Sequence, residues 1–482
     1  MVMMTFLSRR RFLASSFIAG AGLLAPRLLH AATAAPATTL AVARRTIEVK
    51  GRAASVFGAH QADGTSGLFL DPGQRFAVRV DNRSGEDTIL HWHGQTPPPD
   101  QDGVVDTGYA RVVANGAMQD YDFAARPGTH WLHSHHGLQE LQLLAAPLIV
   151  RTAEDLRHDA QEVVVLLHDF SFKEPAELLA GLGGGMNHGD MAGMDHSAMG
   201  HGTMDMPGMA MDLNDVEYDA YLANDRGLDD PQVVKVERGG QVRLRLINGA
   251  SGTAFWIDLG ALDGTVIAAD GNPVQPVAGR RFPMAQGQRL DILLSLPAGD
   301  GGAFPILAQR EGERQRTGII LATPGAAVVK LADLAEAAVP PVDLSLEQRL
   351  EAAAPLPQKL AEVTHRIALT GSMSPYRWTI DDRDWANRLP LKVTPGQRVA
   401  IEMVNKGMMA HPMHLHGHHF QVVGLNGKAV AGAVRDTVLV PIDGTVTIAF
   451  DADNSGRWLF HCHNLLHMAT GMMTEVVYSD AV

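Results

Sequence analysis

A short strand-forming unit recurs three times along the 482-residue chain. Each copy opens with a Gly-Gln turn, continues as alternating polar and apolar residues, and ends at an asparagine. Alternation with a period of two is typical of β strands, and repetition at this scale indicates repeated structural units. We therefore predict three related β domains, whose repeated units run from Pro72 to Asn82, from Gly239 to Asn248 and from Pro395 to Asn405.

Histidines follow the first and third copies in the same register. His91 lies nine residues after Asn82 and His414 lies nine residues after Asn405, whereas Ile257 takes this place in the middle copy. The middle copy also has no histidine cluster of its own on its strands. We expect the first and third domains to share a metal site and the middle domain to act as a spacer.

Four His-x-His pairs supply the candidate ligands. Side chains alternate between the two faces of a strand, so both imidazoles of such a pair lie on one face. In one pair the intervening residue is Cys462, the only cysteine of the chain, which favours a metal ligand over a disulfide. Its sulfur would face away from the flanking imidazoles, so one strand would join two metal centres through covalent bonds alone. The pairs are His91 and His93, His133 and His135, His414 and His416, and His461 and His463.

Composition excludes several classes of function. The chain is longer than one ordinary domain, and its 49 glycines and 26 prolines suit a β-rich protein with many turns. A net charge of −13 argues against nucleic acid and anionic membranes as partners. After residue 30 no apolar run is long enough to span a bilayer.

Residues 1–35 are typical of a targeting segment. The pair Arg9-Arg10 precedes an apolar stretch from Phe17 to Ala25, and small residues that suit cleavage follow. This pattern predicts a twin-arginine signal peptide, export by the Tat machinery and a periplasmic location. The alternative is a basic helical start of the mature protein.

The remaining chain divides by composition. We predict a first domain at 42–152, a second at 160–325, a linker at 326–362 and a third domain at 363–482. The second domain carries an insertion at 183–212 that holds eight methionines and almost no aliphatic residues. Because thioether sulfur suits Cu(I), this insertion is either a patch of soft ligands or a surface segment of biased composition.

The histidine motifs carry a family resemblance over essentially the whole mature chain. The motifs are HWHG at His91, HSH at His133, H-x-x-H-x-H at His411 and H-C-H-x3-H-x4-M at His461. With them the chain resembles three-domain bacterial multicopper oxidases, both laccase-like enzymes and periplasmic copper-resistance oxidases. The resemblance implies an all-β fold of three cupredoxin-like Greek-key β-barrel domains.

The resemblance also implies four copper ions per chain. It gives the type 1 copper four ligands, with Met472 as the weak axial one, the type 2 copper two ligands and the two type 3 coppers six. The type 1 ligands are His411, Cys462, His467 and Met472; the type 2 ligands are His91 and His414; and the type 3 ligands are His93, His133, His135, His416, His461 and His463.

The activity implied by the resemblance is oxidation of phenolic or aromatic donors, or of Cu(I), coupled to reduction of O2 to water. Electrons would pass from Cys462 through His461 and His463. Asp102 matches a family carboxylate near the type 2 copper and would supply protons, although its surroundings also favour a simple turn. The alternative function is a periplasmic copper storage or delivery protein without redox turnover.

Some residues near the motifs are not expected to bind metal. His136, His418 and His419 break the register, and His130 has no assigned role. Asp436 resembles a family segment near the metal end of the third domain, where a hydrogen bond that stabilises a loop is the simpler interpretation.

Overall fold

The computed structural model describes residues 38–183, 213–299 and 301–481. Their strands form six sheets, two in each of three consecutive stretches of chain. We call these stretches the first (38–150), middle (160–322) and last (363–478) sheet pairs. The all-β prediction is confirmed, whereas the predicted signal peptide and nearly all of the methionine-rich insertion lie outside the described residues.

The first sheet pair contains two four-stranded sheets. One has the spatial order β2 (Arg52–His60), β1 (Thr38–Val49), β4 (Phe76–Arg83) and β6 (Met118–Phe123). The other has the order β3 (Leu68–Leu70), β8 (Ala145–Val150), β7 (Gly128–Ser134) and β5 (Leu90–His93).

The middle sheet pair is larger. Its six-stranded sheet has the order β10 (Ala220–Ala223), β9 (Ala160–Phe170), β12 (Gln241–Asn248), β17 (Arg289–Ser295), β14 (Gly264–Ala269) and β15 (Asn272–Gly279). Its five-stranded sheet has the order β11 (Val233–Lys235), β19 (Arg316–Ala322), β18 (Ala303–Arg310), β13 (Phe255–Asp258) and β16 (Arg281–Met284).

The last sheet pair resembles the first in the strands that matter for the site. One sheet has the order β21 (Tyr376–Ile380), β20 (Val363–Met373), β23 (Arg398–Asn405), β29 (Thr445–Asp451), β25 (Phe420–Leu425) and β26 (Lys428–Ala429), with β27 (Val434–Arg435) also paired to β25. The other has the order β22 (Leu391–Val393), β31 (Met473–Tyr478), β30 (Arg457–Cys462), β24 (His411–Leu415) and β28 (Thr437–Val440).

Helices are few and short in the described part of the chain, and none is long and apolar enough to cross a membrane. The α helices are α1 (Pro175–Gly183) and α2 (Leu465–Ala469), and the 3-10 turns are η1 (Pro99–Gln101), η2 (Gln139–Gln142) and η3 (Trp385–Asn387).

The internal repeat is visible in the strand pairing. In each sheet pair the opening strand runs parallel to the strand of the repeated unit: β1 with β4, β9 with β12, and β20 with β23. The repeated asparagine has one role throughout, because the buried amides of Asn82, Asn248 and Asn405 each donate to backbone carbonyls of two separate segments of chain. Each amide therefore ties the end of its strand to two neighbouring segments.

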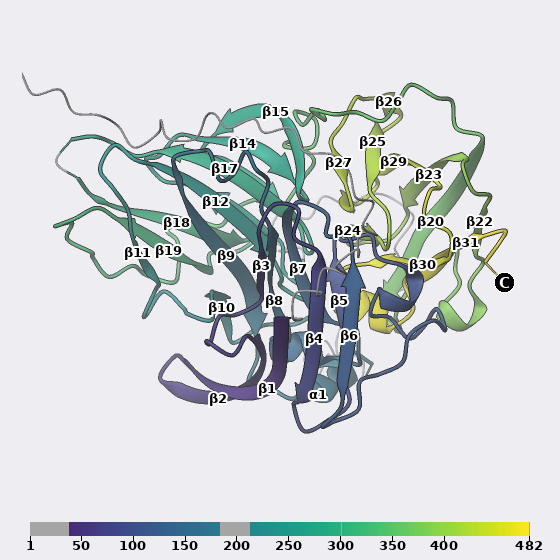
Figure 1. Ribbon diagram of the computed structural model, residues 1–482, viewed down its shortest axis with the longest axis horizontal. Helices are drawn as coiled ribbons and strands as arrows, with labels where there is room; N and C mark the ends of the chain where they lie inside the picture. The colour runs from purple at the N-terminus through teal and green to yellow at the C-terminus, as the bar shows by residue number, and fades with distance from the viewer. Residues whose placement is uncertain (1–37, 184–212, 300, 482) are drawn as a thin grey trace, which may run out of the picture. The chain divides into compact units, whose positions relative to one another are not determined.

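The repeat also aligns the strands that carry histidines. In the first sheet pair His91 on β5 lies opposite His133 on β7, and in the last His414 on β24 lies opposite His461 on β30. The corresponding partners in the middle sheet pair are Ile257 and Ala308. Strands β5 and β7 of the first pair and β24 and β30 of the last pair converge where their histidines meet (Figure 1).

Candidate metal centres

One buried group combines Cys462 with two histidines. The sulfur of Cys462 lies 3.7 Å from Nδ1 of His411 and 3.6 Å from Nδ1 of His467, and these two nitrogens are 3.0 Å apart. All three side chains are buried. The Trp378 ring packs 4.3 Å from the His467 ring and further shields the group from water.

The local fold brings His467 back to Cys462. Strand β30 ends at Cys462, and the side chain of Asn464 caps α2 by accepting from the backbone N–H groups of Leu466 and His467. This cap turns the chain directly after His463, so that the first turn of α2 returns His467 to the sulfur. A strand end and a capped helix thus bring Cys462 and His467 together within six consecutive positions, and β24 supplies His411.

Met472 lies on the same side as Cys462. Its carbonyl accepts the Cys462 N–H at 3.0 Å, and its buried side chain belongs to the core cluster that contains Cys462. Met473 packs instead with Leu459, away from that sulfur. The core packing therefore favours Met472 over its neighbour.

Three further groups consist of histidines alone and join the first and last sheet pairs. Within each group the candidate ligand atoms lie within 4.8 Å of one another. The groups are His91, His93 and His414; His93, His133 and His463; and His135, His416 and His461. They contain every histidine predicted for the type 2 and type 3 coppers.

The three residues of the motif His461-Cys462-His463 belong to three different groups. His461 belongs with His135 and His416, His463 belongs with His93 and His133, and Cys462 faces the mononuclear group. The structure therefore agrees with the expected alternation of side chains.

Hydrogen bonds leave one ring nitrogen of several imidazoles free. Nδ1 of His91 donates to the carbonyl of Asp102, and Nδ1 of His414 donates to the carbonyl of Asp436. Buried ring nitrogens then remain without a partner among the described residues, which is costly unless something else binds there. These atoms include His91 Nε2, His93 Nδ1, His133 Nε2, His135 Nε2, His414 Nε2 and both nitrogens of His463.

One contact requires a cation for a physical reason. Nδ1 of His416 donates to Asp102, and Nδ1 of His461 donates to the carbonyl of Cys462, so the Nε2 atoms of both rings carry lone pairs. These two Nε2 atoms lie only 2.9 Å apart. Two lone pairs repel at this distance, and a metal ion bound to both removes the conflict. The imidazole and thiolate donors suit copper.

Burial keeps the imidazoles in the neutral state that binds metal. It lowers the pKa of His416 to about 4 and that of His463 to about 3, so both are neutral near pH 7. It raises the pKa of the Cys462 thiol, whose thiolate therefore needs a cation beside it. Burial also lowers the pKa values of His93, His133, His135, His411, His414 and His461.

Asp102 bridges two of the histidine groups. Its Oδ2 lies 2.9 Å from Nδ1 of His416, and its Oδ1 lies 3.3 Å from Nδ1 of His91. Burial opposes ionisation, but these two imidazoles hold the pKa of Asp102 well below its usual range. Asp102 follows η1, so the predicted turn is present, and its side chain also contacts the predicted ligands.

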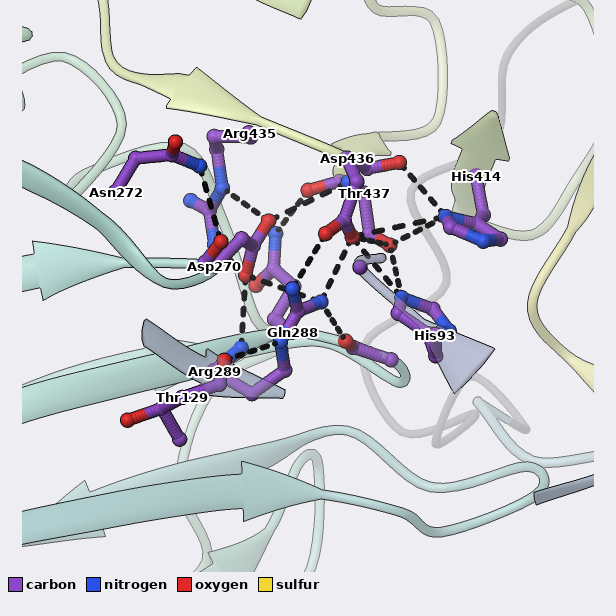
Figure 2. Close-up of polar contacts among 12 residues, drawn as sticks. His93, Thr129, Asp270, Asn272, Gln288, Arg289, His414, Arg435, Asp436 and Thr437 are labelled. Atoms are coloured by element: carbon purple, nitrogen blue, oxygen red, sulfur yellow. Dashed lines mark hydrogen bonds and ion pairs between the residues drawn. The ribbon is translucent and has the colours of Figure 1, made fainter. Parts of the chain in front are cut away.

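Asp436 contacts two ligand histidines, which goes beyond the loop-stabilising bond expected from sequence. Its Oδ1 accepts from Nε2 of His93 at 2.9 Å, and its carbonyl accepts from Nδ1 of His414. Arg289 of the middle sheet pair forms an ion pair with both carboxylate oxygens (Figure 2). Burial opposes ionisation, but this guanidinium holds the pKa of Asp436 well below its usual range.

The prediction that the middle domain is only a spacer is wrong. Besides Arg289, the segment that precedes β10 of the middle sheet pair supplies Asp215, whose carboxylate lies 3.3 Å from Nε2 of His467. Asn464 also donates to Asp215 at 2.8 Å. Both metal regions therefore contact buried charged residues from this part of the chain.

Besides Asp215, a second carboxylate beside a ligand was not predicted from the sequence. Glu140, in η2, lies 2.8 Å from Nδ1 of His133, and both side chains are buried. It is close to HSH in sequence, but no spacing rule marked it. Burial of an acid beside a ligand is visible only once the fold is known.

The discounted histidines join none of these groups. His418 hydrogen-bonds the carbonyl of His416 and the hydroxyl of Tyr478, and His419 donates to the carbonyl of Gly94. His130 is buried, and one of its ring nitrogens contacts the carbonyl of Pro127. His418 and His419 belong to no candidate metal group among the described residues, as expected from their register.

A cavity of about 390 Å³ lies beside the mononuclear group. Its lining includes Met409 and Ala410, which directly precede His411, together with Leu213 and Asn464. Most of the remaining lining is apolar, with the carboxyl of Glu311 as an exception. This cavity is large enough to hold a small aromatic molecule.

The sequence matches models and relatives of the multicopper oxidases. Three family models described as multicopper oxidase match residues 42–155, 186–328 and 359–482. The chain is 31% identical over 422 residues to multicopper oxidase MmcO of Mycobacterium tuberculosis, which covers 84% of this chain and 80% of that protein. It is 26% identical to a copper resistance protein A homolog of Pseudomonas syringae pv. tomato, over 84% of this chain and 86% of the homolog.

The fold matches solved structures as well. The laccase of Botrytis aclada superposes with a TM-score of 0.74 at 21% identity, over 92% of this chain and 88% of the laccase. This match confirms the cupredoxin-like fold expected from the sequence motifs.

Proposed function

The chain belongs to the multicopper oxidase family, and from that premise we propose that it oxidises Cu(I) in the periplasm as part of copper tolerance. Like other enzymes of this family, it uses O2 as the electron acceptor. The Cu(I) substrate, the periplasmic location and a count of four coppers are our proposals. The relatives described as copper resistance protein A support the first, and the twin-arginine pattern supports the second and export by Tat.

The four side-chain groups support the ligand assignment made from sequence. The mononuclear group would hold the type 1 copper, with Met472 as its axial ligand. His91 and His414 would hold the type 2 copper, and the two type 3 coppers would each take three histidines. The two type 3 sets are His93, His133 and His463, and His135, His416 and His461.

When bound, copper supplies one-electron oxidation at the mononuclear site and the reduction of O2 at the histidine groups. The chain supplies the connection between them, because Cys462 is bonded through the backbone to His461 and His463. Its residues also exclude water, since the ligand side chains and Trp378 are buried. Asp102 orients His91 and His416, and its carboxyl group is our proposed participant in supplying protons to the histidine groups.

The single observation that carries the Cu(I) proposal is the position of the residues that directly follow the methionine-rich insertion. Leu213 directly follows the undescribed part of the methionine-rich insertion and lines the cavity beside the mononuclear group. Two residues later, Asp215 contacts the ligand His467. The exposed thioether of Met408, three residues before His411, offers a further soft ligand for Cu(I).

A second candidate substrate is a phenol or aromatic amine. The apolar cavity of about 390 Å³ favours it, because the cavity adjoins the same ligands and is lined mainly by carbon atoms. The two substrates need different parts of the protein. Cu(I) needs thioethers and a carboxylate, whereas an aromatic donor needs the cavity.

Deleting residues 186–211 tests the choice of substrate. We expect the variant to lose Cu(I) oxidation while it oxidises a bulky organic dye at least as fast as the wild type. Equal loss of both activities would contradict the Cu(I) proposal. Copper-loaded wild-type protein should contain about four coppers per chain and show the intense blue colour of a thiolate–copper site.

Oxygen uptake separates the enzyme from a copper store. A copper storage protein would need no electron-transfer route from Cys462 to the histidine groups. We expect wild-type protein supplied with Cu(I) to consume one O2 for every four electrons delivered. Copper binding without O2 uptake would favour storage.

A further inference from the structure

Asp436 controls two ligands that come from different sheet pairs. Its carboxylate accepts Nε2–H of His93, from the first sheet pair, at 2.9 Å. Its carbonyl accepts Nδ1–H of His414, from the last sheet pair, at 2.8 Å. The remaining nitrogens, Nδ1 of His93 and Nε2 of His414, have no hydrogen-bond partner among the described residues and belong to the candidate metal groups. Asp436, with the neighbouring Thr437 hydroxyl at 3.2 Å from both bonded nitrogens, therefore determines which nitrogen of each ring faces the metal.

Arg289 in turn fixes Asp436. Its guanidinium binds both carboxylate oxygens, with Nη1 at 2.7 Å from Oδ1. The same guanidinium donates through Nε to the carbonyl of Thr129 at 3.2 Å and through Nη1 to the carbonyl of Gly287 at 2.9 Å. The side chains of Arg289 and Asp436 are 0% and 1% exposed. The planar guanidinium of Arg289 is hydrogen-bonded through all three of its nitrogens and so keeps the Asp436 carboxylate in one orientation. A lysine cannot reproduce this geometry.

The network extends into the middle sheet pair through Asp270. This carboxylate accepts the backbone N–H of Arg289 at 2.8 Å and pairs with Arg435, the residue before Asp436, at 2.9 Å. Arg435 also pairs with Glu347. Asp270 therefore contacts both Arg289, which binds the Asp436 carboxylate, and Arg435, which precedes Asp436 in the chain (Figure 2).

The ion pair between Arg289 and Asp436 is closely packed by neighbouring residues. A Cβ added at Gly94, the residue after His93, would lie 2.6 Å from Nη2 of Arg289 and 3.0 Å from Oδ2 of Asp436. The turn that follows His93 is thus packed directly against the ion pair. The contact explains why a small residue is needed at this position.

We propose that Arg289 is a positioning residue through which the middle sheet pair selects the metal-facing nitrogens of His93 and His414. The inference rests on the proposed copper sites, and it gives the middle sheet pair a part in building them. The chain of contacts from His93 through Asp436 to Arg289 joins residues of all three sheet pairs. Arg289 touches neither copper ligand itself and acts through Asp436.

The test measures copper retention in copper-loaded Arg289→Met, Arg289→Lys and Asp436→Asn proteins challenged with a chelator. Loss of such an outer partner weakens metal binding by about 10- to 100-fold. We expect this weaker binding for the coppers held by histidines alone. It should appear as a lower copper count and as a weaker near-ultraviolet absorption band of the two type 3 coppers. The blue band at Cys462 should persist, and the lysine variant should lie between methionine and wild type.

A matched control is Arg398→Met. Arg398 is also buried and forms a two-pronged pair with Asp451 in the last sheet pair, at 2.8 and 3.0 Å, without contacting a ligand. We expect it to lower thermal stability but to leave copper retention unchanged.

Three outcomes would overturn the inference. Wild-type retention in both Arg289→Met and Asp436→Asn would show that the pair only packs the junction. If Arg289→Lys loses the blue band together with the histidine-bound coppers, and Arg398→Met does the same, the losses would show a general loss of structure. If wild-type protein binds no copper at these histidines, the proposed function fails together with this role.

Discussion

The carboxylate of Asp215 lies 3.3 Å from Nε2 of His467, although the two residues are 252 positions apart in sequence. Asn464 holds the same carboxylate at 2.8 Å and also caps the helix that carries His467. One short chain of hydrogen bonds thus orients a predicted type 1 ligand from outside its own sheet pair. Such outer partners set both the orientation and the basicity of a metal ligand.

We predict that Asp215→Asn raises the reduction potential of the type 1 copper and lowers kcat/KM for Cu(I) by about 10-fold or more. The carboxylate stabilises the more highly charged oxidised metal and attracts a cationic donor, whereas an amide does neither. Redox titration of the blue band and steady-state Cu(I) oxidation measure the two effects. Asp219→Asn is the matched control, because Asp219 lies in the same segment but binds only Ser171 and Phe172. An unchanged potential in Asp215→Asn would contradict this role.

Cys462→Ser should separate the two metal regions. Serine fills the same buried position but supplies no thiolate, so we expect loss of the blue band with the histidine-bound coppers retained. Oxygen uptake with a reductant should fall by orders of magnitude because the covalent connection no longer begins at a metal ligand. Copper counting and oxygen-electrode rates test this prediction. A serine variant that consumes O2 at the wild-type rate would show that electrons take another route.

Gly94→Ala should be far more harmful than an alanine at another glycine of similar conformation. Gly94 has φ +87°, and an added Cβ would lie 2.3 Å from Nδ1 of buried His130. Gly73 has φ +76° with open space around it. Gly73→Ala should cost about 1 kcal/mol of unfolding free energy for its left-handed backbone. Gly94→Ala should cost about 1–3 kcal/mol more for overpacking, with loss of histidine-bound copper. Thermal unfolding and copper content distinguish the two variants, and equal costs would contradict the packing argument.

Sequence reasoning was accurate where the signal is local. The His-x-His pairs predict faces of strands from a period of two, and the repeated asparagine sets their register, so the predicted histidines and Cys462 fall into the expected groups. Spacing from Cys462 in the sequence favours Met472 over Met473 as the axial ligand, and Met472 lies in the core cluster that contains Cys462 whereas Met473 does not. These relations need only a strand and its neighbour.

The residues behind the ligands could not be predicted in this way. Asp215 and Arg289 reach their ligands across boundaries between sheet pairs, and neither belongs to a motif with characteristic spacing. Arg289 begins an apolar strand and looks like an ordinary exposed strand end, yet its side chain is buried. The absence of histidines made the middle sheet pair look like a spacer, because sequence identifies metal ligands more readily than the charges that orient them.

Glu311 should give a measurable pH dependence of stability that is independent of the metal ligands. Burial raises its pKa to about 7, and the backbone N–H of Val342 binds one carboxyl oxygen at 2.8 Å. The unfolded chain releases this proton near pH 4.3, so the contribution is fully present below about pH 4.3 and is lost as pH rises through 7. Glu311→Gln keeps an acceptor for Val342 and removes the titration. Relative to wild type, the variant should therefore gain about 3 kcal/mol of unfolding free energy between pH 4 and pH 8. Unfolding curves of both copper-loaded proteins across this range test the prediction, and a constant difference between them would contradict it.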